Sequence, residues 1–381
     1  MNRYLQSIEA PAAIEIADRI RKKEAEGELI FKVQTGEPCF NTPAYISNAL
    51  FEAINNNKTN YSYSQGLPEL RNAISFHLQQ AYSVKIDPSN VFITNGGVHA
   101  IHCAIQALIE PGEEVMIFDP SWPQYANITK LYGGIPVKVS TRQTSFVPTI
   151  KSISDNITSK TRMVIFNSPN NPTGKIIPSK TLQEILHFLA DLDVYILFDE
   201  VYDFIVYEEF QSILSNPAFE KLRDRIIYIN SFSKTFCMTG WRLGYAIVPS
   251  ELSASYLKLL QNSVTHVNTF VQLAGVVALR DMAMHKELFK SMMEVYNFRR
   301  NELIEVLTNR NFEFIHPEGS FYFFIRIPNM EPNFVSQLLS NHKIASVPGE
   351  AYGKDFSDYF RISYAVDKTS YDGFLNWLSN G

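Results

Sequence analysis

The sequence is poor in cysteine and lacks long apolar runs. Only Cys39, Cys103 and Cys237 occur among 381 residues; they cannot all pair, and their spacing matches no metal-ligand motif. Reduced thiols in a cytoplasmic protein are the simplest interpretation. The segment from Met1 to Gln6 lacks the apolar stretch of a signal peptide, and no run approaches the roughly 20 residues that span a bilayer. We therefore expect a cytoplasmic protein without a metal site or a membrane span.

An excess of charge of one sign is also missing. The formal net charge is −5, and no block of like charge stands out beyond residues 21–24. This balance gives no indication of a nucleic-acid or membrane-surface partner. Hydrophobic residues make up 45% of the chain and charged residues 19%, which is the range of globular proteins, and the length suits two domains.

Short, continuously apolar segments alternate with segments of helical spacing, such as 98–109 and 180–192. Strands that are apolar throughout and separated by helices indicate a mainly parallel sheet covered on both faces. The predicted strands are 91–94 (VFIT), 114–119 (EVMIFD), 162–167 (RMVIFN), 194–199 (VYILFD), 225–230 (RIIYIN) and 243–248 (LGYAIV).

The pattern changes after about residue 265. Two long helical segments, 270–284 and 286–307, precede a smaller mixed region with strand-like 321–327 (FYFFIRI) and 360–365 (FRISYA). The sequence therefore predicts a large α/β domain followed by a smaller α+β domain.

Unusual residues gather where the predicted strands end. In open α/β sheets, ligands bind beyond the carboxyl ends of the strands. The segments at those ends are 94–97 (TNGG), 119–122 (DPSW), 167–174 (NSPNNPTG), 198–202 (FDEVY) and 231–234 (SFSK). Polar, glycine-rich and ionisable groups are thus expected along one edge of the sheet, which we interpret as the functional site.

Lys234 is the candidate reactive centre of this edge. A lysine can form a Schiff base with an aldehyde if burial or nearby positive charge keeps its amine neutral. Pyridoxal phosphate is the candidate aldehyde, because the remaining groups match its other needs. Its phosphate could be held by backbone N–H groups at the start of a helix (Gly96, Gly97, Val98), by the hydroxyls of Ser231 and Ser233, and by the guanidinium of Arg242.

The cofactor ring has needs of its own. Its pyridine nitrogen must stay protonated to draw electrons from the substrate, and the Asp199 carboxylate could hold that proton. Tyr202 and Asn171 could hydrogen-bond the phenolic oxygen of the ring. Trp122 offers a flat face on which the ring could stack.

The ordered motifs NSPNNPTG, FDEVY and SFSKTFCMTGWRLGY resemble class I aminotransferases of pyridoxal-phosphate fold type I, and more narrowly the bacterial aspartate and aromatic aminotransferase subgroup. Segments 34–43 (QTGEPCFNTP), 61–71 (YSYSQGLPELR), 317–324 (PEGSFYFF), 347–353 (VPGEAYG) and 361–365 (RISYA) fit as well. The resemblance implies a seven-stranded, mainly parallel sheet flanked by helices. It also implies three regions: an N-terminal arm contributing to the small domain (1–45), the large cofactor-binding domain (46–285) and the small domain (286–381).

The resemblance also implies roles for individual residues. Lys234 would form the Schiff base and then carry the proton between the substrate Cα and the cofactor C4′, while Asp199 pairs with the pyridine nitrogen. Arg361 would bind the substrate α-carboxylate, helped by Asn171 and the backbone of Gly36. Tyr61 would reach the phosphate of the neighbouring subunit, so the active unit would be a homodimer. The predicted catalytic residues are Lys234, Asp199 and Tyr202, and the predicted substrate-binding residues are Gly36, Asn171 and Arg361. The predicted cofactor-binding residues are Tyr61, Gly97, Val98, Trp122, Asn171, Asp199, Tyr202, Ser231, Ser233, Lys234 and Arg242.

Three positions bear on the substrate. Val98 is apolar where aspartate enzymes of the subgroup usually have a lysine, and Ile14 lies where a hydroxyl residue is often found. Both favour a donor with a neutral, apolar or aromatic side chain, although 2-oxoglutarate, the usual acceptor, would then need another recognition device. His266 falls in a segment that approaches the partner's site in the family, where it could contact the distal end of the substrate; alternatively it caps the following helix or lies at the dimer interface.

Other interpretations stay open to different degrees. Ser231 to Lys234 matches the Ser-x-x-Lys motif of serine acyl enzymes, but no Lys-Thr-Gly motif occurs, and TNGGVHA is not a dinucleotide-binding Gly-x-Gly-x-x-Gly. A lone lysine is usually a solvated charge, and only the joint occurrence of the set argues against that explanation. A C–S or β-lyase, a decarboxylase or an oxidase on the same scaffold would share Lys234, Asp199 and Arg361.

Overall fold

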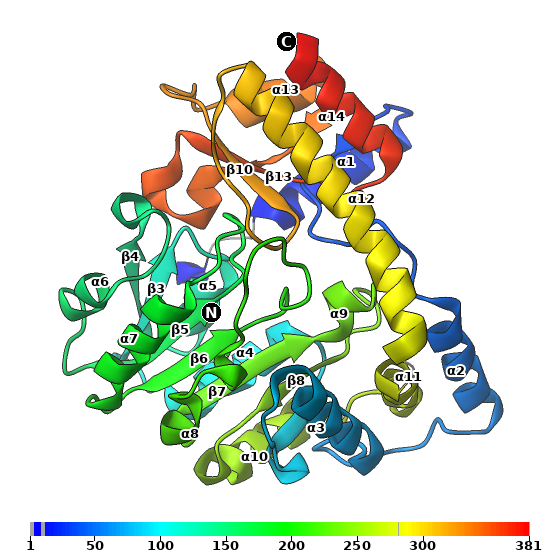
Figure 1. The fold of residues 1–381 in the computed structure, drawn as a ribbon, viewed down its shortest axis with the longest axis vertical. Coiled ribbons are helices and arrows are strands. Elements are labelled where there is room, and N and C mark those ends of the chain that lie inside the picture. Colours follow the sequence, from blue (N-terminus) through cyan, green and yellow to red (C-terminus); the bar gives the residue numbers. More distant parts are fainter. Residues whose placement is uncertain (1–3, 9–11, 281, 381) are drawn as a thin grey trace.

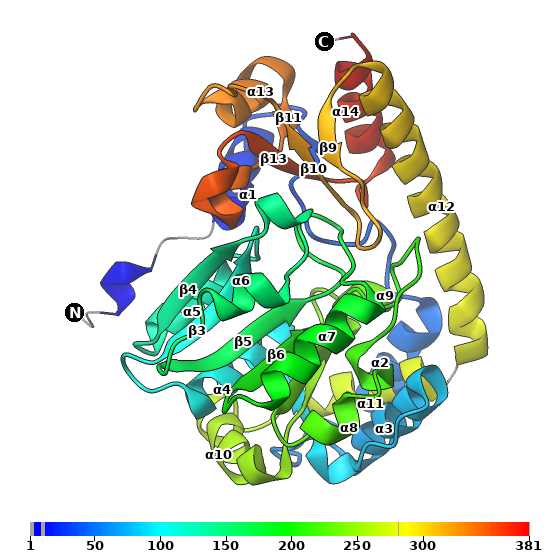
Figure 2. The ribbon, with the colours of Figure 1, turned by 60° about the vertical axis from the view of Figure 1, so that its left-hand side comes forward.

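The structure is a computed structural model that describes residues 4–8, 12–280 and 282–380, and it is organised around two sheets (Figures 1 and 2). The larger sheet has seven strands, as the resemblance implied. Six strands run parallel and β8 runs antiparallel to both its neighbours. Their order is β2 (Val91–Thr94), β8 (Gly244–Ile247), β7 (Ile226–Ser231), β6 (Tyr195–Asp199), β5 (Thr161–Asn167), β3 (Glu114–Asp119) and β4 (Ile135–Ser140).

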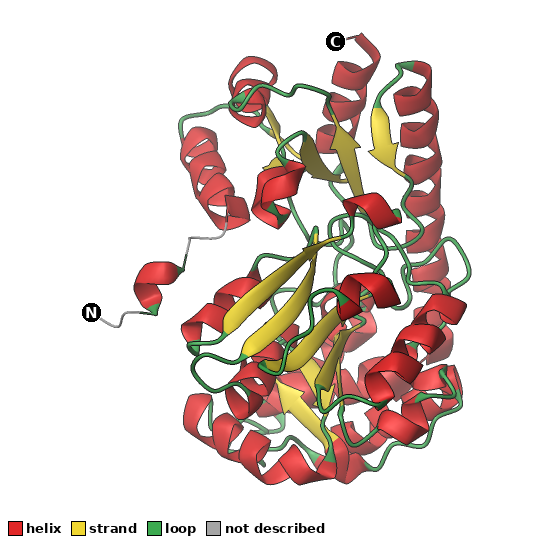
Figure 3. Cartoon of the chain, turned by 90° about the vertical axis from the view of Figure 1, so that its left-hand side faces the viewer, coloured by secondary structure: helices red, strands yellow, loops and turns green. Residues whose placement is uncertain are grey.

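Helices cover both faces of this sheet, which explains why its central strands are apolar throughout (Figure 3). Successive residues of a strand point to opposite faces, so Ile165 and Leu197 pack on one side while Phe166 and Phe198 pack on the other. The first face is covered by α4 (Gly97–Leu108), α5 (Gln124–Leu131) and α10 (Ser253–Ser263). The second is covered by α3 (Pro68–Tyr82), α7 (Ser179–Ala190), α8 (Phe219–Leu222) and α11 (Thr269–Arg280).

The edge strand β4 was not predicted from the sequence. It pairs only with β3, and most of its side chains are exposed or half-buried. Proline, lysine and serine interrupt its apolar residues (IPVKVS), so the continuous apolar run that identified the other six strands is absent from it.

The smaller unit lies beside the carboxyl edge of the large sheet. Its antiparallel sheet has the order β12 (Val347–Pro348), β13 (Tyr359–Ser363), β10 (Tyr322–Arg326) and β9 (Glu313–Ile315). Near the N-terminus, β1 (Phe31–Lys32) pairs with β11 (Ile344–Ala345), so both ends of the chain contribute to this unit. The remaining helices are α1 (Ala12–Ala25), α2 (Ala44–Asn55), α6 (Ile150–Ser154), α9 (Phe232–Thr235), α12 (Met282–Asn309), α13 (Phe334–His342) and α14 (Lys368–Asn380).

The predicted domain limits at residues 45 and 285 and the cytoplasmic location stay predictions. Among the described residues, no helix is long and apolar enough to cross a membrane. In the same part of the chain, no group of three or more His, Cys, Asp or Glu side chains is placed to hold a metal ion.

Candidate active site

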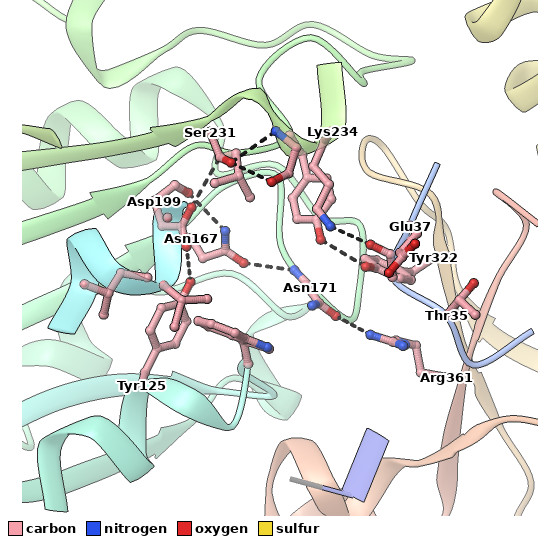
Figure 4. Close-up of a pocket in the computed structure, with 18 of the residues that line it drawn as sticks. Thr35, Glu37, Tyr125, Asn167, Asn171, Asp199, Ser231, Lys234, Tyr322 and Arg361 are labelled. Atoms are coloured by element: carbon pink, nitrogen blue, oxygen red, sulfur yellow. Dashed lines mark hydrogen bonds between the residues drawn. The ribbon is translucent and has the colours of Figure 1, made fainter. Parts of the chain in front are cut away.

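A cavity of about 380 Å³ lies at the carboxyl edge of the large sheet and is bounded on the other side by the small unit (Figure 4). Strand ends of the sheet, the start of α4, the segment 34–37 and the helix α1 all contribute to its wall. Among the predicted site residues, Gly96 and Tyr61 do not line the cavity. Those that line it are Gly36, Gly97, Val98, Trp122, Asn171, Asp199, Tyr202, Ser231, Ser233, Lys234, Arg242 and Arg361. Residues far apart in the sequence therefore share one site.

Lys234 extends into the cavity from α9, the short helix that follows β7. Its Nζ donates a hydrogen bond to the carbonyl oxygen of Gly36 (Figure 4). The pKa of the amine is lowered to about 8, chiefly by burial; the positive charges of Arg361 and Arg242 act in the same direction, whereas the negative charges of Glu37 and Asp199 oppose it. At pH 7 roughly a tenth of the amine is therefore neutral, far more than for a lysine in water, and the neutral amine is the form that attacks an aldehyde.

Asp199 ends β6 and is 4% exposed. Its Oδ2 accepts a hydrogen bond of 2.6 Å from the hydroxyl of Tyr125, and its Oδ1 accepts one of 3.2 Å from the backbone N–H of Val201 (Figure 4). Burial raises the pKa of this carboxyl to about 6, and the two hydrogen bonds act in the opposite direction. Burial disfavours the ionised form of this carboxyl, so a cationic ring nitrogen beside it would strongly stabilise the carboxylate.

Tyr125 was missed at the sequence level. It lies in α5 and is 2% exposed, so in the sequence it looks like any apolar core residue of an amphipathic helix. Asn167 was also missed as a site residue. Its Nδ2 donates a hydrogen bond of 3.0 Å to the carbonyl oxygen of Asp199, and its Oδ1 accepts one of 2.9 Å from the backbone N–H of Asn171. Asn167 is the last residue of β5 and the first of the segment NSPNNPTG, and this position was the signal available for it.

An anion site forms where α4 begins. Gly96 precedes the helix and has φ +80°, a conformation that favours glycine. A Cβ atom there would lie 2.4 Å from Nη2 of Arg242, so glycine allows the guanidinium to lie next to the helix N-terminus. The hydroxyl of Ser231 donates to that of Ser233 at 2.8 Å. Helix dipole, hydroxyl groups and a permanent positive charge together suit a phosphate dianion.

Arg361, on β13, forms the opposite end of the cavity and is 4% exposed. Its Nη1 donates to Oδ1 of Asn171 at 3.1 Å, and Nη2 donates to the carbonyl oxygen of Gln34 at 2.5 Å. Its Nε is buried and has no hydrogen-bond partner within the part of the chain that the structure describes. A buried guanidinium with an unused donor is suited to a carboxylate ligand.

Tyr202 and Tyr322 line the cavity, and their hydroxyls contact each other. The guanidinium of Arg361 lies over the ring of Tyr322, 4.3 Å from its centroid, and the hydroxyl of Tyr322 is 3.0 Å from that of Tyr202. Because a Cβ atom on Gly36 would lie 2.8 Å from the same Tyr322 hydroxyl, the segment carrying Gly36 can approach this closely only without a side chain. Tyr202 lines the cavity, and its hydroxyl is held by this hydrogen bond to Tyr322.

Two residues singled out in the sequence, Tyr61 and His266, do not line this cavity. Tyr61 is 88% exposed and makes an edge-on ring contact with His266, with 5.4 Å between centroids. His266 also hydrogen-bonds the carbonyl of Val267 at 2.7 Å, and neither ring lines the cavity of its own chain among the described residues. The side chain of Ile14 lies outside what the structure describes.

The donor set and shape of the cavity fit pyridoxal phosphate. The anion site would hold the phosphate, Asp199 would face the ring nitrogen, and Trp122, which lines the wall next to Tyr125, is placed to contact the ring face. Lys234 lies between these groups and Arg361, where an amine must be to reach both cofactor and substrate. When bound, the cofactor supplies the aldehyde and the electron-withdrawing ring.

Comparison with known proteins agrees with this geometry. Residues 30–377 match the family model described as aminotransferase class I and II. An aspartate aminotransferase of Pyrococcus horikoshii is 34% identical over 352 residues, covering 91% of this chain and 89% of the relative. Among solved structures, an aspartate aminotransferase from Thermus thermophilus with maleate has a TM-score of 0.94 at 28% identity, covering 100% of this chain and 98% of the other. An aromatic aminotransferase from Pyrococcus horikoshii has a TM-score of 0.87 at 33% identity, with 96% and 97% coverage.

Proposed function

The chain belongs to the class I and II aminotransferases, and on that premise we propose that it moves the amino group of an L-amino acid with a neutral, apolar or aromatic side chain to a 2-oxo acid. Aminotransferase activity and the use of pyridoxal phosphate follow from the family. The preference for the donor rests on one observation: Val98 places an apolar side chain in the cavity wall at the start of α4.

We assign the roles as follows. Lys234 binds the cofactor covalently and then moves the proton that leaves the substrate Cα. Asp199, oriented by Tyr125, keeps the ring nitrogen protonated. Arg361 binds the α-carboxylate, using the Nε that has no partner among the described residues. The anion site, which we define as Gly97, Val98, Ser231, Ser233 and Arg242, holds the phosphate.

Aspartate is the second candidate donor. The relative in Pyrococcus horikoshii and the structural neighbour in Thermus thermophilus are both named aspartate aminotransferases. The neighbour named aromatic aminotransferase, with a fold that is also closely similar, supports the first candidate. The names of relatives therefore leave the donor to experiment, and lyase, decarboxylase and oxidase reactions are tested by the same assay.

A panel of amino acids without any oxo acid tests the proposal. The purified holoprotein is mixed with each amino acid, and the visible spectrum and released products are measured. We expect leucine, phenylalanine or tyrosine to convert the cofactor to its amine form with release of the matching 2-oxo acid, faster than aspartate does. Ammonia or carbon dioxide from every active amino acid, without the amine form, would show a different reaction.

Exchanging Val98 for lysine is expected to change the donor preference. A cation at this point of the wall would attract an acidic side chain and disfavour an apolar one, so Val98→Lys should raise kcat/KM for aspartate by about tenfold and lower it for leucine. Val98→Leu, which keeps the apolar surface, is the matched control. If aspartate gains nothing from the lysine, Val98 serves packing only.

We also propose that the active unit is a homodimer in which Tyr61 contacts the phosphate in the neighbouring subunit. A tyrosine that is 88% exposed is unusual for a large aromatic side chain, and a partner surface would cover it. Analytical ultracentrifugation of the wild type and of Tyr61→Phe, with titration of cofactor affinity, tests both parts: a dimer whose cofactor affinity falls in the variant is expected.

A further inference from the structure

The charged groups of the cavity leave one cation without a function. Among the residues that the structure describes, six charged side chains line it: Arg21, Glu37, Asp199, Lys234, Arg242 and Arg361. The proposed function, on which this inference rests, uses Asp199 for the ring nitrogen, Lys234 for the covalent bond, Arg242 for the phosphate and Arg361 for the α-carboxylate. Glu37 acts on Lys234 through its charge. Arg21 is the positive charge that remains.

Arg21 reaches the cavity from α1 because of the way this helix is anchored. Ile16 and Ile20, four residues apart and hence on one face, pack into the small unit against Ile30 and Leu339. Ala17 and Arg21 follow each of them by one residue, form the neighbouring face and line the cavity. The face that anchors α1 thus directs the other face toward the substrate.

The helix also lies on the substrate side of the cavity rather than the phosphate side. It contacts β12, which pairs with the strand of Arg361 through the register Val347 to Arg361. A group on this side of the cavity meets the substrate, whose α-carboxylate is held by Arg361. The phosphate lies at the other end, near Arg242.

We propose that Arg21 binds the second carboxylate of a dicarboxylic substrate, above all of a dicarboxylic 2-oxo acid such as 2-oxoglutarate, and so provides the recognition that Val98 cannot. A bidentate contact between guanidinium and carboxylate is stronger than the ion pair that Arg21 now makes. That ion pair, with Asp18 at 2.5 Å, joins side chains that are 74% and 65% exposed.

The same arrangement accommodates neutral substrates. Because the Arg21 side chain is largely in solvent, a substrate without a second carboxylate leaves it there at little cost, with Asp18 as its partner. The apolar surface at Val98 then receives the side chain. One site would thus serve a neutral donor in one half of the reaction and a dicarboxylic acceptor in the other.

The test compares two acceptors in Arg21→Ala. With one fixed active donor, KM for 2-oxoglutarate should rise by about tenfold or more, whereas KM for pyruvate, which has a single carboxylate, should change by less than about twofold. Arg21→Lys should show a smaller rise, because an ammonium keeps the charge but loses the bidentate geometry. Arg19→Ala is the matched control: Arg19 is exposed on the same helix and does not line the cavity.

A binding measurement separates this proposal from the proposed function. Maleate, a dicarboxylate that cannot react, is titrated into wild type and Arg21→Ala with propionate as the single-carboxylate comparison. The variant should bind maleate about tenfold more weakly and propionate equally well. Equal losses for both acids, or no loss for either, would overturn the role of Arg21 even if transamination is observed. Absence of transamination in the wild type would overturn the proposed function while the maleate titration still tests Arg21.

Discussion

Replacing Lys234 with alanine is expected to abolish turnover, with a fall in kcat of at least about 10⁴-fold, which corresponds to more than about 5 kcal/mol of activation free energy. Two functions would be lost at once, namely the covalent attachment of the cofactor and the movement of the proton from the substrate Cα. No other lysine can take its place, because Lys234 is the one lysine among the described residues that line the cavity.

The variant can be checked independently of activity. After treatment with borohydride and denaturation, wild-type protein should retain the cofactor as added mass on the peptide containing Lys234, and Lys234→Ala should retain none. Lys180→Ala, at an exposed lysine outside the cavity, should behave as wild type. Cofactor that remains covalently bound to Lys234→Ala would mean that a different residue forms the bond.

Replacing Arg361 with alanine is the second change with a large expected effect. We expect kcat/KM to fall by roughly 100-fold, or about 3 kcal/mol, because a hydrogen-bonded charge pair with the α-carboxylate is lost. The loss should appear chiefly in KM, since the contact is made in the ground state as well as in the transition state. It should be similar for apolar, aromatic and acidic donors and for both acceptors, because all of them carry the α-carboxylate.

This uniform effect distinguishes Arg361 from Arg21. Arg361→Lys should recover part of the loss, whereas Arg326→Ala, on the neighbouring strand and paired with Asp358 at 2.6 Å, should leave all the kinetic constants near those of wild type. Thermal unfolding of each variant checks that the fold is intact, because Arg361 also binds Asn171 and the Gln34 carbonyl. A defect confined to one donor would contradict the assignment of Arg361 to the α-carboxylate.

Much of the large sheet could be predicted because it is covered on both faces. Buried strands must be apolar throughout, so six of the seven strands appear in the sequence within one or two residues of their observed bounds. The second predicted helical segment, 286–307, lies within α12 (Met282–Asn309).

The sequence by itself determined the reactive set, because parallel strands carry their carboxyl ends to one edge and the motifs at those ends are local. Asp199, Asn171 and Lys234 could all be found in this way. Arg242 precedes β8, which runs antiparallel and therefore begins at the same edge. Only the tertiary structure decided what each of them contacts. The Lys234 amine meets the carbonyl of Gly36 across 198 residues, and Arg361 meets that of Gln34 across 327.

The role of Arg21 could be found only from the tertiary structure. In the sequence it is one charge in the run 21–24 on an amphipathic helix, and nothing local distinguishes it from Arg19. Its place in the cavity wall follows from the packing of Ile16 and Ile20. These two side chains contact a cluster that includes Leu339 and Ala345, which are more than 300 residues away in the sequence. Local spacing fixes which face of a helix a side chain occupies, whereas long-range packing decides what that face meets.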